Sequence, residues 1–414
     1  MVTIKPFKAI RPAQQYSKEV ISLPYDVMSR KEAFEMAKDK PYSFLHICRS
    51  EIDLPESTNP YEEAVYKKAK ENIDNNLKEG IFIKEDKPCF YIYREIMDGR
   101  IQTGLVACAS IDDYQNNVIK KHEFTRYEKE LDRINHFDIC NANTEPVFLT
   151  YRKNDTINDV IEKCTLENKP VYDIISDDNI RHIVWIINDE NIINILSENF
   201  NKIESLYIAD GHHRTASAVK VGLKRRENDP EYDGTEEFNF FLAVMFPHTD
   251  LKIFDYNRVV SDLNGLSESD FISKIKEKFF VSEHLSDEPY RPEKPHVFGM
   301  YLNNKWYKLE AKEDIVIKND IIRRLDVSVL QEHILAPILG IEDPRKDHRI
   351  DFVGGIRGLN ELEKRVHTDM KAAFALYPVS IEDLLEVSDN GLVMPPKSTW
   401  FEPKLGSGLF LHEL

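Results

Sequence analysis

One stretch near the middle of the chain, residues 207–218 with the sequence YIADGHHRTASA, constrains the fold more than any other. Residues 205–209 form a short, mostly apolar run, which predicts a buried strand. Asp210 and Gly211 interrupt this run, and glycine allows the tight or left-handed backbone that a sharp reversal needs. Residues 215–221 contain good helix formers without Gly or Pro. The stretch therefore predicts a strand, a turn and the first turn of a helix.

A helix that begins directly after such a turn favours anion binding. Its first N–H groups have no intrahelical partner, and its dipole attracts negative charge. His212, His213 and Arg214 add three donors, and a guanidinium can hold a phosphate through two hydrogen bonds. Asp210 leaves a carboxylate for a metal ion or a proton. A satisfied structural turn is the alternative, because neither a Walker loop nor an H-x-x-x-H spacing is present and adjacent His side chains on a turn diverge.

Charge and cysteine content limit the classes of function and location. The 414 residues include 55 Lys and Arg against 72 Asp and Glu, a formal net charge of −17, so we expect no nucleic-acid partner. Five scattered cysteines without a C-x-x-C pair are typical of reduced thiols in a cytosol. No apolar run approaches about 18 residues, and the N-terminus lacks the apolar segment of a signal peptide. We expect a soluble, cytoplasmic protein with no membrane partner.

A second informative patch spans residues 118–136, VIKKHEFTRYEKELDRINH. A charge run of this kind is often only a solvated face. The alternative is that Lys121, His122, Glu123 and Arg126 face a cleft that holds a polyphosphate. Cations beside Glu123 would keep its carboxylate ionised, so this residue is the candidate general base for a substrate hydroxyl and a candidate ligand of Mg²⁺.

Two further residues are weaker candidates for a site. Asp26 follows a proline-fixed segment, and Ser29 with Glu32 forms a capping box for the next helix, which frees Asp26 from capping. Arg258 is a candidate second phosphate clamp, and an ordinary ion pair with one of many acids is its alternative.

The C-terminal tail, residues 394–404, combines prolines that favour an extended path with side chains that donate hydrogen bonds. A disordered tail would not normally carry Trp400 and Phe401, so we expect it to be ordered and packed across the core. Lys397 and Lys404 either reach phosphates or belong to a structural clasp.

Alternating strands and helices over residues 171–260 indicate an α/β core. Strands are predicted at residues 43–49, 89–95, 103–111, 181–188 and 240–246, and helices at 61–79, 128–135, 191–202, 269–279 and 326–339. We expect three regions: an N-terminal α/β region (1–155) that contributes to the site, a central region with the DGHHR turn (156–265), and a C-terminal α/β region with the ordered tail (266–414).

Residues 208–214, IADGHHR, resemble the D-G-H-H-R phosphate motif of the ParB/sulfiredoxin superfamily. This superfamily includes DNA-segregation CTPases, sulfiredoxins and free-serine kinases. Over nearly its full length the chain is similar to the domain-of-unknown-function family 1015 (DUF1015). The matching stretches are PYDV at 24–27, IKKHE at 119–123, DGHHR at 210–214 and MPPKSTWF at 394–401.

The resemblance implies an α/β (α+β) fold with a ParB/sulfiredoxin-like mixed-sheet core and additional N-terminal and C-terminal α/β segments. It also implies that the turn holds the phosphates of ATP or ADP. The expected nucleotide-binding residues are Gly211, His212, His213, Arg214, Thr215, Lys121, Arg126 and Arg258. Glu123, Asp210 and His213 are the expected catalytic residues, with Asp210 and Glu123 as ligands of Mg²⁺.

The leading functional hypothesis is a nucleotide-dependent kinase of a small hydroxy amino acid. The superfamily precedent is conversion of free L-serine to O-phosphoserine, which would place the protein in serine metabolism. One alternative is a CTP- or ATP-binding regulatory switch without a small-molecule product. Another is a metal-dependent phosphoester hydrolase with His212, His213 and Asp210 as ligands. Sulfiredoxin chemistry is disfavoured, because no cysteine lies beside the turn.

Overall fold

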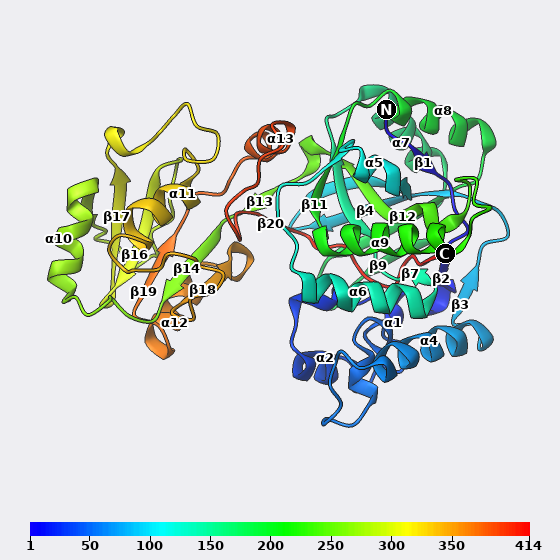
Figure 1. Ribbon diagram of the computed structural model, residues 1–414, viewed down its shortest axis with the longest axis horizontal. Coiled ribbons are helices and arrows are strands. Elements are labelled where there is room, and N and C mark those ends of the chain that lie inside the picture. The colour runs from blue at the N-terminus through cyan, green and yellow to red at the C-terminus, as the bar shows by residue number, and fades with distance from the viewer. The chain divides into compact units, whose positions relative to one another are not determined.

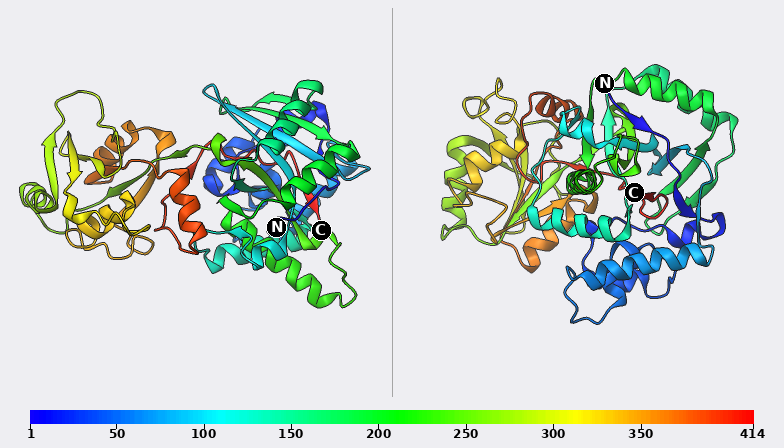
Figure 2. Two further views of the ribbon diagram at one scale, coloured as in Figure 1. Left: turned by 90° about the horizontal axis from the view of Figure 1, so that it is seen from above. Right: turned by 45° about the vertical axis from the view of Figure 1, so that its right-hand side comes forward.

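The computed structural model describes residues 1–414 and divides the chain into two compact units, drawn in Figures 1 and 2. The first unit comprises residues 1–251 and 403–414, and the second comprises residues 252–402. This division differs from the three regions expected from the sequence. Strands from residues 1–155 and from 156–265 join one sheet, so the boundary predicted at residue 155 lies inside the first unit.

The first unit is built on a mixed sheet of nine strands. Their order is β6 (Ile119–Lys120), β11 (Leu206–Asp210), β8 (Val147–Tyr151), β12 (Phe240–Pro247), β5 (Arg100–Ser110), β4 (Phe90–Met97), β10 (Arg181–Ile187) and β9 (Tyr172–Ile175), with β1 (Ile4–Lys5) on β5. Pairs β6–β11 and β8–β12 are parallel, and the other pairs are antiparallel. The fold is therefore mixed α/β, as predicted.

Apolar strands explain why this sheet forms the core. All five residues of β8 are buried, as are seven of the eight in β12, so both faces of the central strands are covered. The predicted hairpin around Asp98 and Gly99 is confirmed, because β4 and β5 pair from Tyr91–Val106 to Met97–Arg100 and both turn residues have positive φ. β11 pairs with β8 and therefore lies beside the buried central strands of the sheet.

Helices α4, α6 and α9 lie side by side in the first unit (Figure 1). The helices of this unit are α1 (Ser17–Val20), α2 (Arg30–Ala37), α3 (Leu45–Cys48), α4 (Glu63–Lys78), α5 (Ile111–Gln115), α6 (Tyr127–Cys140), α7 (Asp155–Glu167), α8 (Glu190–Asn201) and α9 (His212–Asn228). The capping box predicted at Ser29 and Glu32 is present at the start of α2. None of the helices in the structure is both long and apolar enough to span a membrane.

One element was predicted wrongly. Residues 43–49 were expected to form a strand, but the segment forms helix α3, with the amides of Cys48 and Arg49 bonded to the carbonyls of Phe44 and Leu45. Phe44, Leu45, Ile47 and Cys48 are all buried. A short apolar run that is covered on every side has no periodicity to distinguish a helix from a strand.

The second unit contains an antiparallel six-stranded sheet with helices. The strand order is β15 (Phe279–Glu283), β17 (Lys305–Ala311), β16 (Val297–Leu302), β19 (Ala372–Ala375), β14 (Tyr256–Val260) and β18 (Ile350–Gly354), and the helices are α10 (Glu268–Lys278), α11 (Asp326–Leu330), α12 (Asn360–Thr368) and α13 (Ile381–Asp389). The predicted helix 326–339 begins as α11 and continues as a π-helical turn over residues 331–335.

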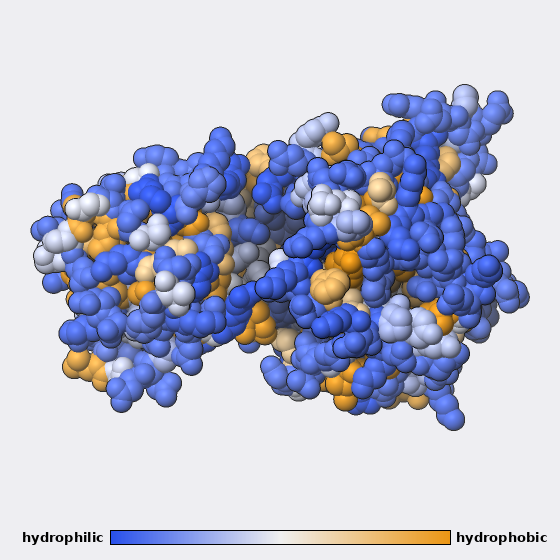
Figure 3. Space-filling model, turned by 90° about the horizontal axis from the view of Figure 1, so that it is seen from below, coloured by the Kyte–Doolittle hydropathy of each residue, from blue (hydrophilic) through white to orange (hydrophobic).

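Three two-stranded ribbons complete the strands: β2 (Ile10–Pro12) with β3 (Phe82–Lys84), β7 (Ala142–Asn143) with β21 (His412–Glu413), and β13 (Ile253–Phe254) with β20 (Trp400–Phe401). The face of the molecule drawn in Figure 3 is mostly hydrophilic, with apolar residues scattered singly or in small groups. This surface agrees with a chain in which 31% of the residues are charged.

The last residues of the chain, 403–414, return to the first unit and pack inside it. Ser407 bridges to Ser22, and Leu411 bridges to Ile10. The ring of Phe410 lies 5.2 Å from that of Tyr91 and is buried. The tail is therefore held by main-chain bonds and by an aromatic anchor.

We expect Phe410→Ala to lower the free energy of unfolding by about 3–5 kcal/mol, because it leaves a cavity beside Tyr91. Leu166→Ala is the control, since Leu166 on α7 is 78% exposed and should change stability by less than about 0.5 kcal/mol. Denaturant unfolding of both variants measures the difference. Equal, small effects would show that the tail does not stabilise the first unit.

Candidate functional site

The DGHHR turn joins β11 to α9 through a left-handed glycine. Gly211 has φ +90°, and a Cβ atom there would lie 3.0 Å from Nε of Arg214. The amide and the hydroxyl of Thr215 both donate to the carbonyl of Gly211, at 2.9 and 3.0 Å. This is the first intrahelical hydrogen bond of α9. The amides of residues 212–214 therefore have no acceptor within the helix. The predicted strand, turn and helix are confirmed.

Asp210 is the most strongly held group of the turn. Its Oδ1 accepts the amide of Gly211 at 2.8 Å, and its Oδ2 lies 3.1 Å from Nζ of Lys404 and 3.8 Å from Nη2 of Arg214. Burial alone would raise the pKa of Asp210, but the two cations outweigh it and hold the pKa well below its usual range. The carboxylate is therefore ionised at neutral pH.

Both histidines of the motif are neutral at pH 7. Burial lowers the pKa of His212 well below its ordinary value, and burial followed by the Arg126 guanidinium lowers the pKa of His213. Nε2 of His212 accepts the amide of His122 at 3.5 Å, and Nε2 of His213 accepts the amide of Arg126 at 3.0 Å. In a neutral ring the other nitrogen then carries the proton, so Nδ1 of each ring is a donor.

The two histidines of the motif do not turn matching nitrogens toward one point, as the ligand set of the hydrolase hypothesis would require. Backbone amides occupy Nε2 of His212 and of His213. The structure assembles no group of three or more His, Cys, Asp or Glu side chains that could hold a metal ion. Neighbouring residues at the start of a helix point in different directions, which is why these side chains do not converge.

Arg214 lies beneath the turn, away from its open face. The side chain is 3% exposed, and Nη1 donates to the carbonyl of Pro146 at 2.6 Å. Burial opposes its charge, but nearby carboxylates, first that of Asp26, raise its pKa above the ordinary value. Arg214 is therefore buried against the turn, and its expected role as a phosphate ligand stays a prediction.

Residues of the second patch border the turn. Oε2 of Glu123 lies 3.9 Å from Nδ1 of His212, and the Glu123 side chain is 40% exposed. The charge of Lys121 acts on His212, and that of Arg126 acts on His213. Both cations are exposed. Three predicted site residues, Lys121, Glu123 and Arg126, are therefore brought to the same turn.

A buried network beneath the turn was missed by the sequence analysis. The guanidinium of Arg133 lies 4.0 Å from the ring of Tyr25, and Oε1 of Glu145 accepts the amide of Tyr25 at 3.2 Å and the hydroxyl of Ser407 at 2.8 Å. No spacing links these residues in the sequence. Asp26, which follows Tyr25 in the chain, is exposed, and its charge acts on His213. This weaker candidate from the sequence therefore lies near the turn.

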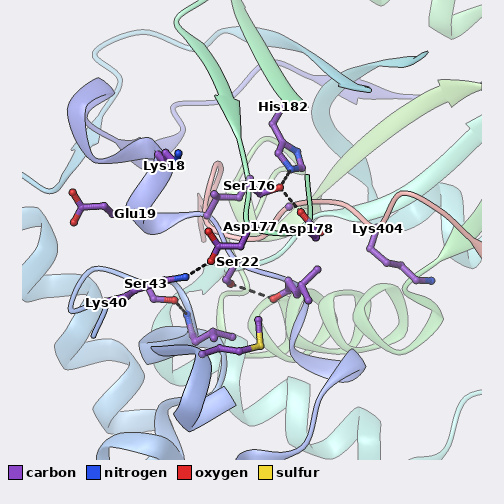
Figure 4. Close-up of a pocket in the computed structure, with 15 residues that line it drawn as sticks. Lys18, Glu19, Ser22, Lys40, Ser43, Ser176, Asp177, Asp178, His182 and Lys404 are labelled. Atoms are coloured by element: carbon purple, nitrogen blue, oxygen red, sulfur yellow. Dashed lines mark hydrogen bonds and ion pairs between the residues drawn. The ribbon is translucent and has the colours of Figure 1, made fainter. Parts of the chain in front are cut away.

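A small pocket adjoins Lys404 in the first unit (Figure 4). Its volume is about 80 Å³. The labelled residues bring cations and carboxylates together, and Lys40 forms an ion pair with Asp177. Nε2 of His182 lies 2.9 Å from the hydroxyl of Ser176. A lining with both signs of charge suits a small zwitterion.

Arg258 lies in β14 of the second unit, where its Nη2 donates to the carbonyl of Pro396 at 3.3 Å. The sequence left two roles open for Lys404, binding a phosphate or belonging to a structural clasp. The structure places it against Asp210, where it belongs to the turn as well as to the tail.

The fold is that of a mixed α/β protein in which the DGHHR sequence forms the turn between β11 and α9. The chain belongs to the family of proteins of unknown function DUF1015, whose family model matches residues 4–328. This match confirms the resemblance to DUF1015 over residues 4–328, and the stretch at 394–401 lies outside it. No match was found among curated proteins.

Three solved structures illustrate the likeness to known folds. A free serine kinase in complex with AMP has 12% identity and a TM-score of 0.35, covering 74% of this chain and 92% of the kinase. A mutant free serine kinase in complex with ADP has 14% identity and a TM-score of 0.36, with coverages of 74% and 92%. SbnI with a C-terminal truncation, from Staphylococcus aureus, has 11% identity and a TM-score of 0.40, with coverages of 74% and 87%. At such low identities and TM-scores, no ligand or activity transfers to this chain.

We expect Lys404→Met to destabilise the fold most at neutral pH. A carboxyl group with a depressed folded pKa contributes stability above its unfolded pKa of about 3.9, and this contribution is lost as pH falls through the folded value. Because Lys404 holds the pKa of Asp210 low, the variant should lose roughly 1–3 kcal/mol at pH 7 and clearly less near pH 3.

Denaturant unfolding at the two pH values measures this difference. Lys18→Met is the matched control, because Lys18 is exposed and lines the same pocket. It should change stability by less than about 0.5 kcal/mol. An equal loss for Lys404→Met at both pH values would contradict the assigned role of the ion pair.

Proposed function

We propose that this protein is a phosphotransferase that moves a phosphoryl group from ATP or ADP to the hydroxyl of a small hydroxy amino acid, with free L-serine as the first acceptor to test. The observation that carries the proposal is the left-handed Gly211, which leaves the amides of residues 212–214 without intrahelical acceptors. The D-G-H-H-R resemblance supports a nucleotide as the anion.

The phosphates have a sufficient set of partners at this turn. The three amides and Nδ1–H of His213 are neutral donors, and Lys121 and Arg126 supply positive charge beside them. Phosphoryl transfer depends mainly on positioning and on neutralising the charge of the transferred group. Thr215 and Arg214 act from beneath, by fixing the backbone that carries these donors.

Glu123 is the proposed general base. Its carboxylate accepts the proton of the acceptor hydroxyl, whose oxygen forms a bond to the terminal phosphorus. The bond between that phosphorus and the bridging oxygen breaks. The leaving group is ADP when the donor is ATP, and AMP when the donor is ADP. Nδ1 of His212 lies 3.9 Å from Oε2, which is too long for a direct hydrogen bond.

A magnesium ion fits the donors as a companion of the nucleotide. Mg²⁺ is usually held by one or two carboxylates together with substrate phosphates. Asp210 and Glu123 would provide those carboxylates, and the bound ion would neutralise phosphate charge. The pocket beside Lys404 offers the two signs of charge that a free amino acid requires.

Replacing Gly211 tests the nucleotide site. Gly211→Ala forces a strained φ and a contact with Arg214, so we expect nucleotide affinity to fall at least tenfold in calorimetric titrations. Gly80→Ala is the matched control, because Gly80 has φ +74° and nothing within 4 Å of an added Cβ. It carries the same backbone strain away from the site and should keep wild-type affinity. Unchanged affinity in Gly211→Ala would exclude the turn as the phosphate site.

Replacing Glu123 tests the chemistry. Glu123→Gln should reduce turnover by at least about 100-fold while leaving nucleotide affinity nearly unchanged. Glu128→Gln serves as the control, since Glu128 is an exposed carboxylate in the first turn of α6. A fully active Glu123→Gln enzyme would refute the role of this residue.

The direct assay uses purified full-length protein with ATP, ADP or CTP, Mg²⁺ and a pool of amino acids, and detects phosphorylated products by mass spectrometry. Formation of O-phosphoserine supports the proposal. Nucleotide binding without any product would instead support a regulatory switch.

A further inference from the structure

The second unit contains a cavity that the proposed phosphotransfer does not use. Its volume is about 360 Å³, and all of its lining residues fall within 252–402. Arg258 from β14 and Pro396 from the tail segment line it, together with Glu342, Asp343 and Arg345. Only one of these charged side chains is deeply buried, and that residue is Arg258.

The guanidinium of Arg258 has few partners for a buried cation. The residue is 4% exposed, and its hydrogen bonds go to main-chain carbonyls, those of Tyr256 and Pro396. Its carbon Cζ lies 5.3 Å from the centroid of the Phe352 ring. A guanidinium has five N–H donors, so these two carbonyls leave part of its hydrogen-bonding capacity unused.

No carboxylate compensates the charge of Arg258. Burial lowers its pKa to about 10, and the only opposing influence comes from Tyr256. Arginine stays charged in proteins, so the cost of burying it is not relieved by losing a proton. Buried charges are normally paired, and an unpaired one is strongly destabilising.

The acids in the same cavity are engaged elsewhere or lie at its surface. Asp343 is held by Arg345 through two contacts of 2.9 Å, Nε to Oδ1 and Nη2 to Oδ2. Glu342 is exposed. Neither forms an ion pair with Arg258. The cavity is therefore lined by a buried positive charge that no carboxylate of the chain pairs with.

We propose that this cavity binds a small ligand through an oxyanion, a phosphoryl or carboxylate group, and that Arg258 is the residue that pairs with it. A planar guanidinium matches both groups through paired hydrogen bonds. Arg258 was a candidate phosphate clamp in the sequence, and the proposal goes further by giving it a cavity of its own, whose lining includes no residue of the DGHHR turn.

The experiment compares thermal unfolding of the full-length wild type, Arg258→Met and Arg323→Met at constant ionic strength, with chloride replaced by inorganic phosphate or by acetate. Arg323 is the control, because it is an exposed arginine of the second unit that does not line the cavity. A ligand that binds the folded state raises Tm. We expect the wild type to gain roughly 2–4 °C or more from at least one of the two anions. Arg258→Met should lose that gain, and Arg323→Met should keep it.

Without an added anion, Arg258→Met should melt no lower than the wild type, since it replaces an uncompensated charge with an apolar side chain of similar length. A purely structural arginine would give the opposite result. Should Arg258→Met fail to fold, Arg258→Lys keeps the charge, loses the planar fork and should show a weakened gain. An equal gain in the wild type and the Arg258 variant, or no gain in the wild type, would overturn the proposal.

A nucleotide titration of the same variants identifies the source of the oxyanion. If Arg258→Met weakens ADP binding tenfold, the group is a phosphate of the nucleotide itself. If ADP binding is unchanged while the anion-dependent gain is lost, the group belongs to a second small ligand. Gly211→Ala separates this site from the turn, because it should lose ADP affinity and retain the gain that depends on Arg258.

Discussion

The ion pair between Asp210 and Lys404 is the interaction on which the candidate site depends. It joins the end of β11 to the C-terminal tail, which lies 194 residues further along the chain. The pair keeps a largely buried carboxylate ionised at the point where the chain reverses through Gly211. Without a cation, burial would favour protonation of that carboxyl group and remove its charge. The tail is thus part of the site.

The charges of the motif are divided between the inside and the outside of the turn. Arg214 is directed inward, where it bonds Pro146 and faces carboxylates. His213 is kept neutral and oriented by a backbone amide, while the exposed Lys121 and Arg126 border the helix start. Neutral donors with exposed cations around them suit a ligand that carries several negative charges.

Much of the fold follows from local sequence signals. The β4–β5 hairpin follows from Asp98 and Gly99, the start of α2 from its capping box, and the central turn from Gly211. The strand predicted at residues 43–49 was wrong, because burial of all the apolar residues in this segment removes the periodicity that separates a helix from a strand. The π-helical turn after α11 has no signal in the sequence, since the same residues also suit a regular helix.

The site was less accessible to sequence reasoning than the fold. Motif spacing located Asp210, Gly211 and the histidines, and a charge run located Glu123. The inward direction of Arg214 and the pairing of Lys404 depend on contacts between segments far apart in the chain, as does the network of Arg133 and Glu145. The division into two units was also missed, because strand pairing across residue 155 is a long-range property.

Hydrogen exchange with and without ADP and Mg²⁺ tests the central claim most directly. If the turn grips the phosphates, amides in the peptide covering residues 206–215 should exchange more slowly when the nucleotide is bound, and Gly211→Ala should abolish that protection. Unchanged exchange in this peptide under saturating nucleotide, with protection only elsewhere, would contradict the account.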